Sequence, residues 1–340
     1  MKSLNKTFKR IITTILIILL LLILIILGIK AKEIYNTNKI LKKHIVNSAE
    51  SAIESKSLSV TTGVQQIMIG SLCNNYDDTL QVLLTMKEAG YNGIELNDFM
   101  IQDTSLMVKL MCKFSGMPIG NGGKLDWNLL IEESGLEVIS LHTDLSAIEK
   151  SPSQVAQKAK SFGTDKVVIT GMYRFDYSDI NEVENLAKRL NAAGKALSEE
   201  GIQLLYHNHN CELQKVSETK TAYDIIIEQT DSRYVNFEFD SYWMADGGAN
   251  VTALMEKLGS RMILWHINDR GCTASGPYMT PILKENATEL GNGNMDLDTL
   301  VEIAKENGVE AVIVETHQNW VDNDPIQSFI NSYSYLENNF

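Results

Sequence analysis

The chain has 340 residues, of which 44% are hydrophobic, so it is long enough and apolar enough to form one large domain with a sizeable core. Its formal charge of −13 is unevenly spread: residues 1–45 carry nine bases and one acid, and the remainder carries 21 bases and 42 acids. So acidic a body excludes nucleic acid as a partner, because such binding depends on neutralising phosphates. The four cysteines form no CxxC pair, which argues against a zinc knuckle.

The first apolar segment, residues 11–29, is a charge-free run of 19 residues. At about 1.5 Å per residue, a helix of this length just crosses a hydrocarbon core of roughly 30 Å. No small-residue cleavage site follows, so we expect an uncleaved transmembrane signal anchor over residues 1–30 and a stalk or linker over 31–63. Four bases precede the run and favour an extracytoplasmic catalytic domain, although the lysines that follow it leave the opposite topology open.

From residue 66 onward, short apolar runs alternate with longer amphipathic stretches. Strands are expected at 66–72, 93–96, 137–143, 165–171, 202–209, 234–240, 261–269 and 310–316. Helices are expected near 77–90, 152–162, 180–200, 220–230, 250–259, 295–308 and 325–338, with an irregular excursion at 101–135. Eight such units predict a (β/α)8 TIM barrel over residues 64–340. A doubly wound sheet is the alternative, but no GxGxxG turn follows the first strand.

Polar side chains collect where these strands end. They are Glu95, His142, His207, His209, Glu238, Asp240, His266, Asp269 and Glu315. Each has an ordinary explanation: a strand-end His is often structural, and Asp240 and Asp269 could cap helices. Because the carboxyl ends of barrel strands converge on one mouth, the set predicts a single ring of His and carboxylate groups. Such a set suits one divalent ion, namely Mn²⁺, Mg²⁺, Co²⁺ or Zn²⁺.

The same residues resemble the sugar phosphate isomerase/epimerase superfamily, the xylose isomerase-like TIM barrels, over about residues 66–338. The motifs that carry the resemblance are "GYNGIEL", "YHNHNCEL", "FEFDSYWMADGG", "LWHIND", "ELGNGNMDL" and "IVET". The resemblance implies one metal ion held by four strand-end residues. Asp240, His266 and Glu315 match the pattern, and His207 stands where the family usually has Glu.

The activity implied is that of a metal-dependent isomerase or epimerase, which removes the proton next to the carbonyl of a keto-sugar or cyclitol through a metal-stabilised enediolate. Its catalytic groups would be Glu315, His207 and His209. Its substrate contacts would be Glu95, His142, Trp243, Asp269 and Glu289.

Two departures from the family pattern keep other activities open. The YHNH strand is similar to the inosose dehydratase branch, and Trp243 stands where epimerases place a helper His. A dehydratase or lyase acting on a keto-sugar, inosose or 3-keto-glycoside is therefore the first alternative, and a non-catalytic, membrane-tethered carbohydrate-binding barrel is the second. Few bases lie near the mouth, chiefly Arg174, Arg270 and Lys284, which favours an unphosphorylated substrate. The sequence leaves the metal's identity and the oligomeric state open.

Overall fold

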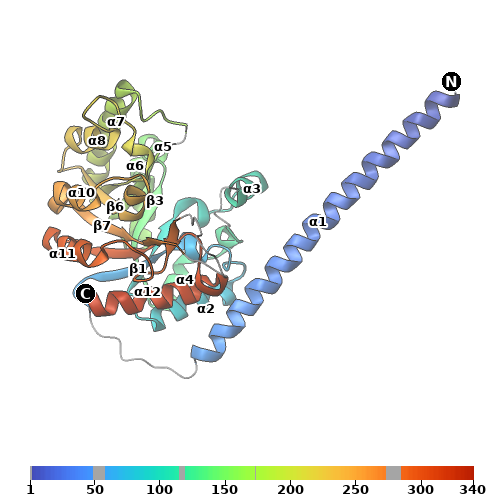
Figure 1. Ribbon diagram of the computed structural model, residues 1–340, viewed down its shortest axis with the longest axis horizontal. Coiled ribbons are helices and arrows are strands. Elements are labelled where there is room, and N and C mark those ends of the chain that lie inside the picture. Colours follow the sequence, from blue (N-terminus) through green and yellow to red (C-terminus); the bar gives the residue numbers. More distant parts are fainter. Residues whose placement is uncertain (1, 49–57, 115–118, 173, 273–284) are drawn as a thin grey trace, which may run out of the picture. The chain divides into compact units, whose positions relative to one another are not determined.

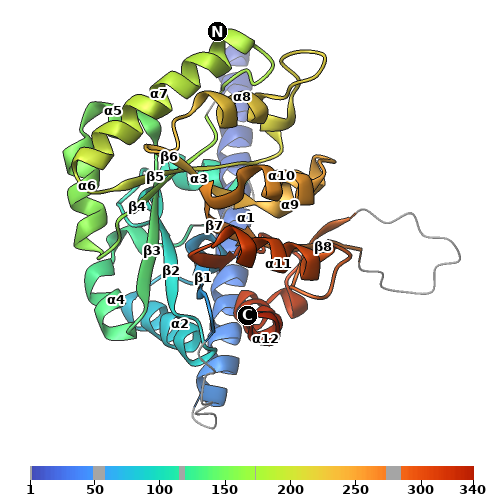
Figure 2. The same cartoon turned by 90° about the vertical axis from the view of Figure 1, so that its left-hand side faces the viewer.

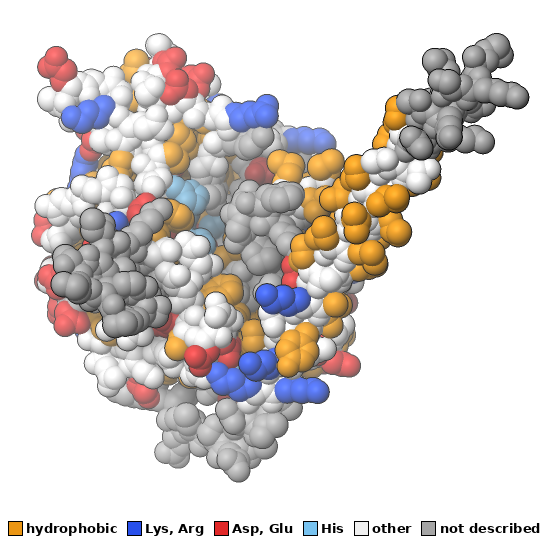
Figure 3. All heavy atoms as spheres, turned by 45° about the vertical axis from the view of Figure 1, so that its right-hand side comes forward, with side chains coloured by type: hydrophobic (Ala, Val, Ile, Leu, Met, Phe, Trp, Pro, Cys, Tyr) orange, Lys and Arg blue, Asp and Glu red, His pale blue; other side chains and the backbone are white. Residues whose placement is uncertain are grey.

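The computed structural model describes residues 2–48, 58–114, 119–172, 174–272 and 285–340, which fall into two units, Met1–Glu50 and Ser51–Phe340. The first unit is one helix, α1 (Lys2–Ser48), which continues well into the segment predicted as a stalk. The apolar side chains along residues 11–29 are exposed, and many appear in orange in Figure 3. By length and composition, α1 is able to cross a membrane.

The second unit is a closed, parallel, eight-stranded barrel with helices around it (Figures 1 and 2), which confirms the predicted TIM barrel. Its strands are β1 (Thr61–Gln65), β2 (Gly93–Asn97), β3 (Glu137–Thr143), β4 (Lys166–Thr170), β5 (Gln203–His207), β6 (Val235–Asp240), β7 (Met262–Ile267) and β10 (Ala311–Val314). A small antiparallel pair, β8 (Asp269–Gly271) and β9 (Asn286–Thr288), follows β7.

The helices of this unit alternate with the strands, as the amphipathic periodicity predicts. They are α2 (Tyr76–Glu88), α3 (Leu106–Phe114), α4 (Trp127–Ser134), α5 (Leu145–Lys150), α6 (Pro152–Ser161), α7 (Ile180–Glu199), α8 (Ala222–Gln229), α9 (Ser241–Asp246), α10 (Val251–Leu258), α11 (Leu297–Asn307) and α12 (Pro325–Asn339). Most begin at an Asp, Asn or Thr whose side chain accepts a backbone N–H of the first turn.

The prediction for the first strand is wrong. The apolar run at 66–72 begins as a 3₁₀ turn, Gln66–Ile69, and β1 is the more polar Thr61–Gln65. Gln65 ends the strand by accepting the backbone N–H of Ile67 with its side chain, at 2.6 Å. Gly63 suits the crowded barrel interior, since a Cβ there would lie 2.3 Å from Ile139 Cδ1. β1 therefore begins inside the last residues of the predicted linker.

An apolar layer inside the barrel lies next to the polar mouth. Leu205 and Leu264 belong to a buried cluster with residues of β3, β4 and β10. Because side chains two residues apart along a strand point the same way, His207 and His266 also point inward, one step closer to the carboxyl ends. The apolar layer thus forms the floor beneath the polar groups.

Gly194 in α7 offers a test of the packing between helix and barrel. A Cβ at this position would lie 2.2 Å from the backbone oxygen of Tyr234. Helix propensity alone would make Gly194→Ala stabilising by up to about 1 kcal/mol. We expect it instead to lower the free energy of unfolding by about 1–3 kcal/mol, because backbone must move to relieve the clash. Denaturant unfolding measures this, with the exposed Asn185→Ala of the same helix as the control; a gain in stability at Gly194 would contradict the packing.

Candidate metal centre

The mouth of the barrel gathers five of the chain's six histidines. The rings of His142, His207 and His266 lie with their centroids 4.6–5.9 Å apart, and His209 lies 5.1 Å from His207. Figure 3 shows histidine side chains (pale blue) reaching the surface on this face. The strand register explains the convergence: β5 pairs His207 with Glu238 of β6, and Asp240 pairs with His266 of β7.

Four buried residues could hold a metal ion together. One ligand atom from each of His207, Asp240, His266 and Glu315 lies within 4.8 Å of all the others. His266 Nδ1 lies 2.9 Å from Glu315 Oε2 and 3.9 Å from Asp240 Oδ2. The structure therefore brings together the four residues expected to be ligands.

The donor chemistry fits a divalent cation. Asp240 Oδ2 is buried and has no hydrogen-bond partner within the described part of the chain. The other oxygen of this carboxylate accepts the N–H of Trp243 at 2.9 Å and so caps α9. Burial, and then the charge of Glu315, raise the pKa of Asp240 well above its usual value. An unpaired buried carboxylate is costly unless a proton or a cation compensates it. Two imidazoles and two carboxylates are the donor set of zinc-type and manganese-type sites.

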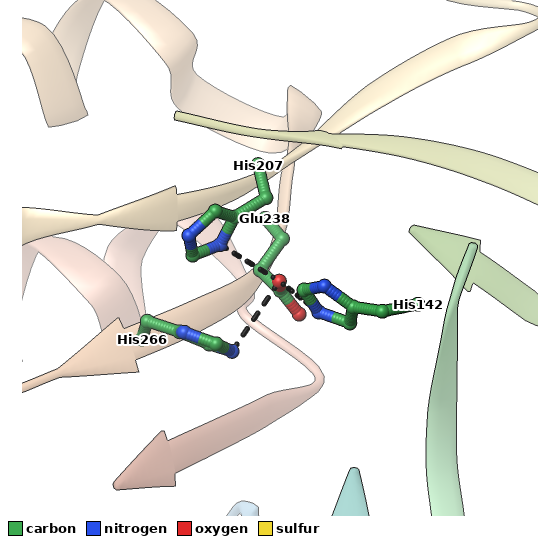
Figure 4. A group of neighbouring side chains, drawn as sticks. All are labelled: His142, His207, Glu238 and His266. Carbon is green, nitrogen blue, oxygen red and sulfur yellow. Dashed lines mark hydrogen bonds and ion pairs between the residues drawn. The ribbon is translucent and has the colours of Figure 1, made fainter. Parts of the chain in front are cut away.

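A second, inner group lies against these ligands (Figure 4). Glu238 Oε2 lies 2.9 Å from His207 Nδ1, 3.0 Å from His142 Nε2 and 3.3 Å from His266 Nε2. Glu95 Oε1 lies 2.5 Å from His142 Nε2 and 3.0 Å from His266 Nε2. Burial raises the pKa of Glu238, as does the nearby charge of Glu95, and brings it to about 8. Glu95 and His142, expected to contact substrate, thus lie within hydrogen-bonding distance of other side chains of the site.

Asn208, between the two histidines of "HNH", and Glu212, just after them, hold the mouth in shape. Asn208 points away from the rings: its side chain donates to the backbone oxygen of Asp240 at 2.9 Å and accepts the Asp240 N–H at 3.1 Å. Glu212 accepts the backbone N–H of His209 at 3.0 Å and the hydroxyl of Tyr206 at 2.8 Å. These contacts tie the end of β5 to β6 and fix the turn that carries His209.

An aromatic wall flanks the predicted ligands. The Trp243 ring lies 5.5 Å from His209 and 5.4 Å from His317, centroid to centroid. Trp243 Nε1 and His317 Nε2 are buried, and neither has a hydrogen-bond partner among the described residues. Burial lowers the pKa of His209 to about 4, assisted by His207, so its ring is neutral at pH 7. The wall places His317 Nε2 3.5 Å from Glu315 Oε2 and holds the Trp243 ring beside the imidazole of His317.

Asp269 and Glu289 have their oxygens engaged in loop contacts. Asp269 accepts backbone N–H groups from Arg270 and from three residues of the segment 291–295, at 2.8–3.2 Å. Glu289 Oε1 accepts the N–H of Val321 at 2.9 Å. Both side chains are buried, so they shape the loop over the β7 and β10 ends.

Sequence reasoning gave no role to Glu238 and placed His317 outside the ligand set. The signal that could have found them is the two-residue period of a strand: Glu238 precedes Asp240 by two, and His317 follows Glu315 by two. Within β6, Glu238 therefore points towards the same side as Asp240. His317 lies beyond the end of β10, and its ring reaches within 3.5 Å of Glu315.

Metal binding to this site should tighten as the pH rises. Burial alone would lower the pKa of His266, but surrounding carboxylates, chiefly Glu238, outweigh it and hold the pKa well above its usual value. The metal-free site therefore holds a proton that a cation must displace, and fewer protons remain to be displaced at higher pH. We expect the dissociation constant to fall up to about tenfold per pH unit for each proton released. Calorimetry in buffers of different ionisation enthalpy counts the protons released. A metal affinity that stays unchanged between about pH 6 and pH 9 would contradict this prediction.

Comparison with known proteins assigns the chain to a family. The chain belongs to the xylose isomerase-like TIM barrel family, whose model matches residues 83–336.

Similar curated proteins include inosose dehydratases. That of Mesomycoplasma hyopneumoniae strain J is 26% identical over 63% of this chain, and that of Clostridium botulinum is 21% identical over 76%. The matched segment spans 66% of the length of the mycoplasma enzyme and 88% of the clostridial one.

Similar solved structures show the same fold. A sugar phosphate isomerase/epimerase from Parabacteroides distasonis has a TM-score of 0.65 at 18% identity, with 85% of this chain and 97% of that chain covered. The IOLI protein with a binding zinc atom has a TM-score of 0.56 at 16% identity, covering 82% and 96%. A probable 3-DHS dehydratase from Bacillus anthracis has a TM-score of 0.58 at 13% identity, covering 82% and 98%.

Proposed function

We propose that this chain is a divalent-metal-dependent enzyme that removes the proton next to the carbonyl of an unphosphorylated keto-sugar or keto-cyclitol. One observation carries the proposal: His207, Asp240, His266 and Glu315 offer ligand atoms within 4.8 Å of one another in a buried site. A divalent ion bound there would polarise the substrate carbonyl and stabilise the negative charge that forms when the proton leaves.

Glu315 is the base in this proposal. The charges of His317 and His266 overcome the effect of burial and hold the pKa of Glu315 well below its usual value, so it is ionised at neutral pH. An ionised carboxylate at the mouth is able to accept a proton from a bound substrate. His207 lies on β5, two strands away from β7, which carries His266, and three from β10, which Glu315 follows. Its imidazole therefore comes from a different side of the mouth than the Glu315 carboxylate.

The two sides of the site are chemically different, and this favours elimination over epimerisation. Epimerisation needs two comparable groups that exchange one proton on opposite faces. Here a carboxylate, Glu315, shares the mouth with the neutral imidazole of His209, whereas the two nitrogens of His207 are taken by Glu238 and by the proposed ion. Elimination needs two different proton transfers, one from carbon and one to the departing hydroxyl, and unlike groups suit it. The likeness to inosose dehydratases supports this outcome; the likeness to isomerase/epimerase structures supports epimerisation as the second candidate.

The compensated charge of Arg270 and the aromatic wall support an unphosphorylated substrate. Arg270 forms ion pairs with Asp246 and Glu285, so its charge is already compensated. Lys284 lies outside the described residues. The aromatic wall of Trp243, His209 and His317 suits the apolar face and hydroxyls of a sugar or cyclitol ring.

Proton exchange tests the proposal. The full chain, loaded with Mn²⁺, Co²⁺ or Zn²⁺, is incubated in D₂O with an inosose, ketohexoses and a 3-keto-glucoside, and proton NMR follows the signal next to the carbonyl. Deuterium incorporation with loss of a hydroxyl supports the dehydratase, and incorporation with inversion supports the epimerase. Binding of a sugar without exchange in any member of the panel would contradict enzymatic function and favour the carbohydrate-binding barrel.

We also infer that α1 anchors the chain in a membrane through residues 1–30, with the barrel on the extracytoplasmic side. The four bases before the apolar run support this orientation. Resistance to alkaline extraction and digestion of the barrel by protease added to spheroplasts are the expected results. Release by alkaline washing, or protection from the protease, would contradict the anchor or the orientation.

A further inference from the structure

The inner layer of the site contains buried groups that no step of the proposed reaction uses. Glu95 and Glu238 are fully buried, and His142 is 7% exposed. They lie beneath the predicted ligands and contact the ligand imidazoles on the side away from Asp240 and Glu315. Their short contacts with one another and with the ligand imidazoles suit a supporting role for these side chains.

Each of the two ligand histidines has one nitrogen engaged by an inner carboxylate. His207 Nδ1 lies 2.9 Å from Glu238 Oε2. His266 Nε2 lies 3.0 Å from Glu95 Oε1, whereas its Nδ1 faces Glu315 and the unpartnered oxygen of Asp240. A metal-binding imidazole usually donates its other N–H to a carboxylate, which fixes the ring and its tautomer and raises its basicity.

His142 joins the two inner carboxylates. Its Nε2 lies 2.5 Å from Glu95 Oε1 and 3.0 Å from Glu238 Oε2, and its Nδ1 lies 2.9 Å from Thr170 Oγ1. Gln65 and Ser140 donate further hydrogen bonds to Glu95, at 3.2 and 2.7 Å. The inner carboxylates are therefore held from behind, and their free movement against the ligand rings is restricted.

We propose that Glu95 and Glu238 are positioning residues for the metal ligands and that His142 holds them in place. This inference rests on the metal site proposed above. Glu238 keeps the proton of His207 on Nδ1, so His207 binds the ion through Nε2. Glu95 keeps the proton of His266 on Nε2, so His266 binds through Nδ1. The two histidines thus use opposite ring nitrogens for one ion.

The same inner group could itself hold an ion, since His142, His207, Glu238 and His266 also offer ligand atoms within 4.8 Å of one another. Two simultaneous ions would require His207 and His266 to ligate through both ring nitrogens and to give up both protons. The short contacts between these nitrogens and carboxylate oxygens are those of hydrogen bonds that retain a proton. One ion per chain is therefore expected.

The experiment measures metal affinity and the ligating nitrogens of the full chain in detergent. Zn²⁺ affinity is determined by chelator competition for wild type, Glu238→Ala, Glu238→Gln and Glu95→Ala. The control is Asp324→Asn, which changes a buried carboxylate that caps α12 and belongs to neither group of possible metal ligands. NMR couplings between ¹¹³Cd²⁺ and ¹⁵N-labelled histidine identify the nitrogen that binds the ion. This measurement uses the wild type, so it does not depend on a variant that folds.

The expected result is one ion per chain, coupled to Nε2 of His207 and Nδ1 of His266. Affinity should fall about 10–100-fold in both Ala variants and less in Glu238→Gln, whose amide oxygen still accepts the His207 N–H; the control should match wild type. Normal affinity in the Ala variants, or the opposite nitrogens, would overturn the positioning role while leaving the metal site standing. A second ion that is lost in His142→Ala would also overturn it. Absence of any ion in the wild type would overturn the proposed function itself.

Discussion

His266→Ala is expected to lower the free energy of unfolding of the metal-free protein by about 3–5 kcal/mol at pH 7.5, besides abolishing metal binding. The ring of His266 is fully buried and lies 2.9 Å from Glu315, 3.0 Å from Glu95 and 3.3 Å from Glu238. Removing it leaves these carboxylates buried without their shared partner, and a buried unpaired charge costs far more than the cavity alone.

The sign of the pH dependence follows from the same contacts. The pKa values of Glu95 and Glu315 are held well below the usual range, partly by His266, so this partner stabilises the fold above their unfolded pKa. The carboxylates outweigh burial and hold the pKa of His266 itself well above its usual value, so its contribution is complete below its unfolded pKa of about 6.5 and declines as the pH rises. At pH 5 both contributions are present, so the deficit of the variant should be larger there than at pH 7.5.

Denaturant unfolding with EDTA at pH 7.5 and pH 5 measures both effects. The matched control is His317→Ala, since His317 contacts Glu315 from a partly exposed rim position, at 3.5 Å. We expect this control to cost less than about 1 kcal/mol. Equal losses in the two variants, or a smaller deficit at pH 5 than at pH 7.5 for His266→Ala, would show that the cluster is not organised around His266.

Glu315→Gln is expected to reduce proton exchange at the carbon next to the carbonyl by about 10²–10⁴-fold at saturating metal. The amide keeps the size of the side chain but cannot accept the substrate proton. It also binds the cation more weakly, so metal must be titrated to saturation before rates are compared. The exchange rate in D₂O, with whichever keto-sugar or keto-cyclitol the wild type accepts, is the measurement.

Glu212→Gln provides the control for this prediction. Glu212 is another fully buried carboxylate near the mouth, but it bonds Tyr206 and the backbone of His209 rather than the predicted ligands. The exchange rate of Glu212→Gln should stay within about tenfold of wild type, a smaller change than the loss expected for a missing base. If Glu315→Gln exchanged as fast as this control, another group, such as His207 or His209, would have to be the base.

The convergence of the four proposed metal ligands could be predicted from the sequence because parallel strands end at a common edge. His207 and Asp240 are the last residues of β5 and β6, and Glu315 directly follows β10. Counting along apolar runs therefore places them at one mouth. The count failed for β1, where the polar Thr61–Gln65 forms the strand and the segment Gln66–Ile69 turns away. The Gln65 side chain ends the strand by accepting the backbone N–H of Ile67.

The inner layer and the loop contacts could not be predicted in the same way. The approach of His142 to Glu95 and Glu238 depends on side-chain conformations and on a register shift between β2 and β3 near Ile94 and Leu96. The engagement of Asp269 by segment 291–295 depends on how a loop distant in sequence closes over it. Neither set of contacts is encoded in strand periodicity. The sequence therefore predicted substrate contacts for Glu95, His142 and Asp269 without indicating these bonds within the protein.

Metal content is the most direct measurement of the central claim. Elemental analysis of the purified full chain, after dialysis against Mn²⁺, Co²⁺ or Zn²⁺ and removal of free ion, should give about one ion per chain in wild type and none in His207→Ala or His266→Ala. Wild type without bound metal under all three conditions would contradict a metal-dependent enzyme. Retention of the ion by His207→Ala would remove His207 from the ligand set and leave it an acid or base of the reaction.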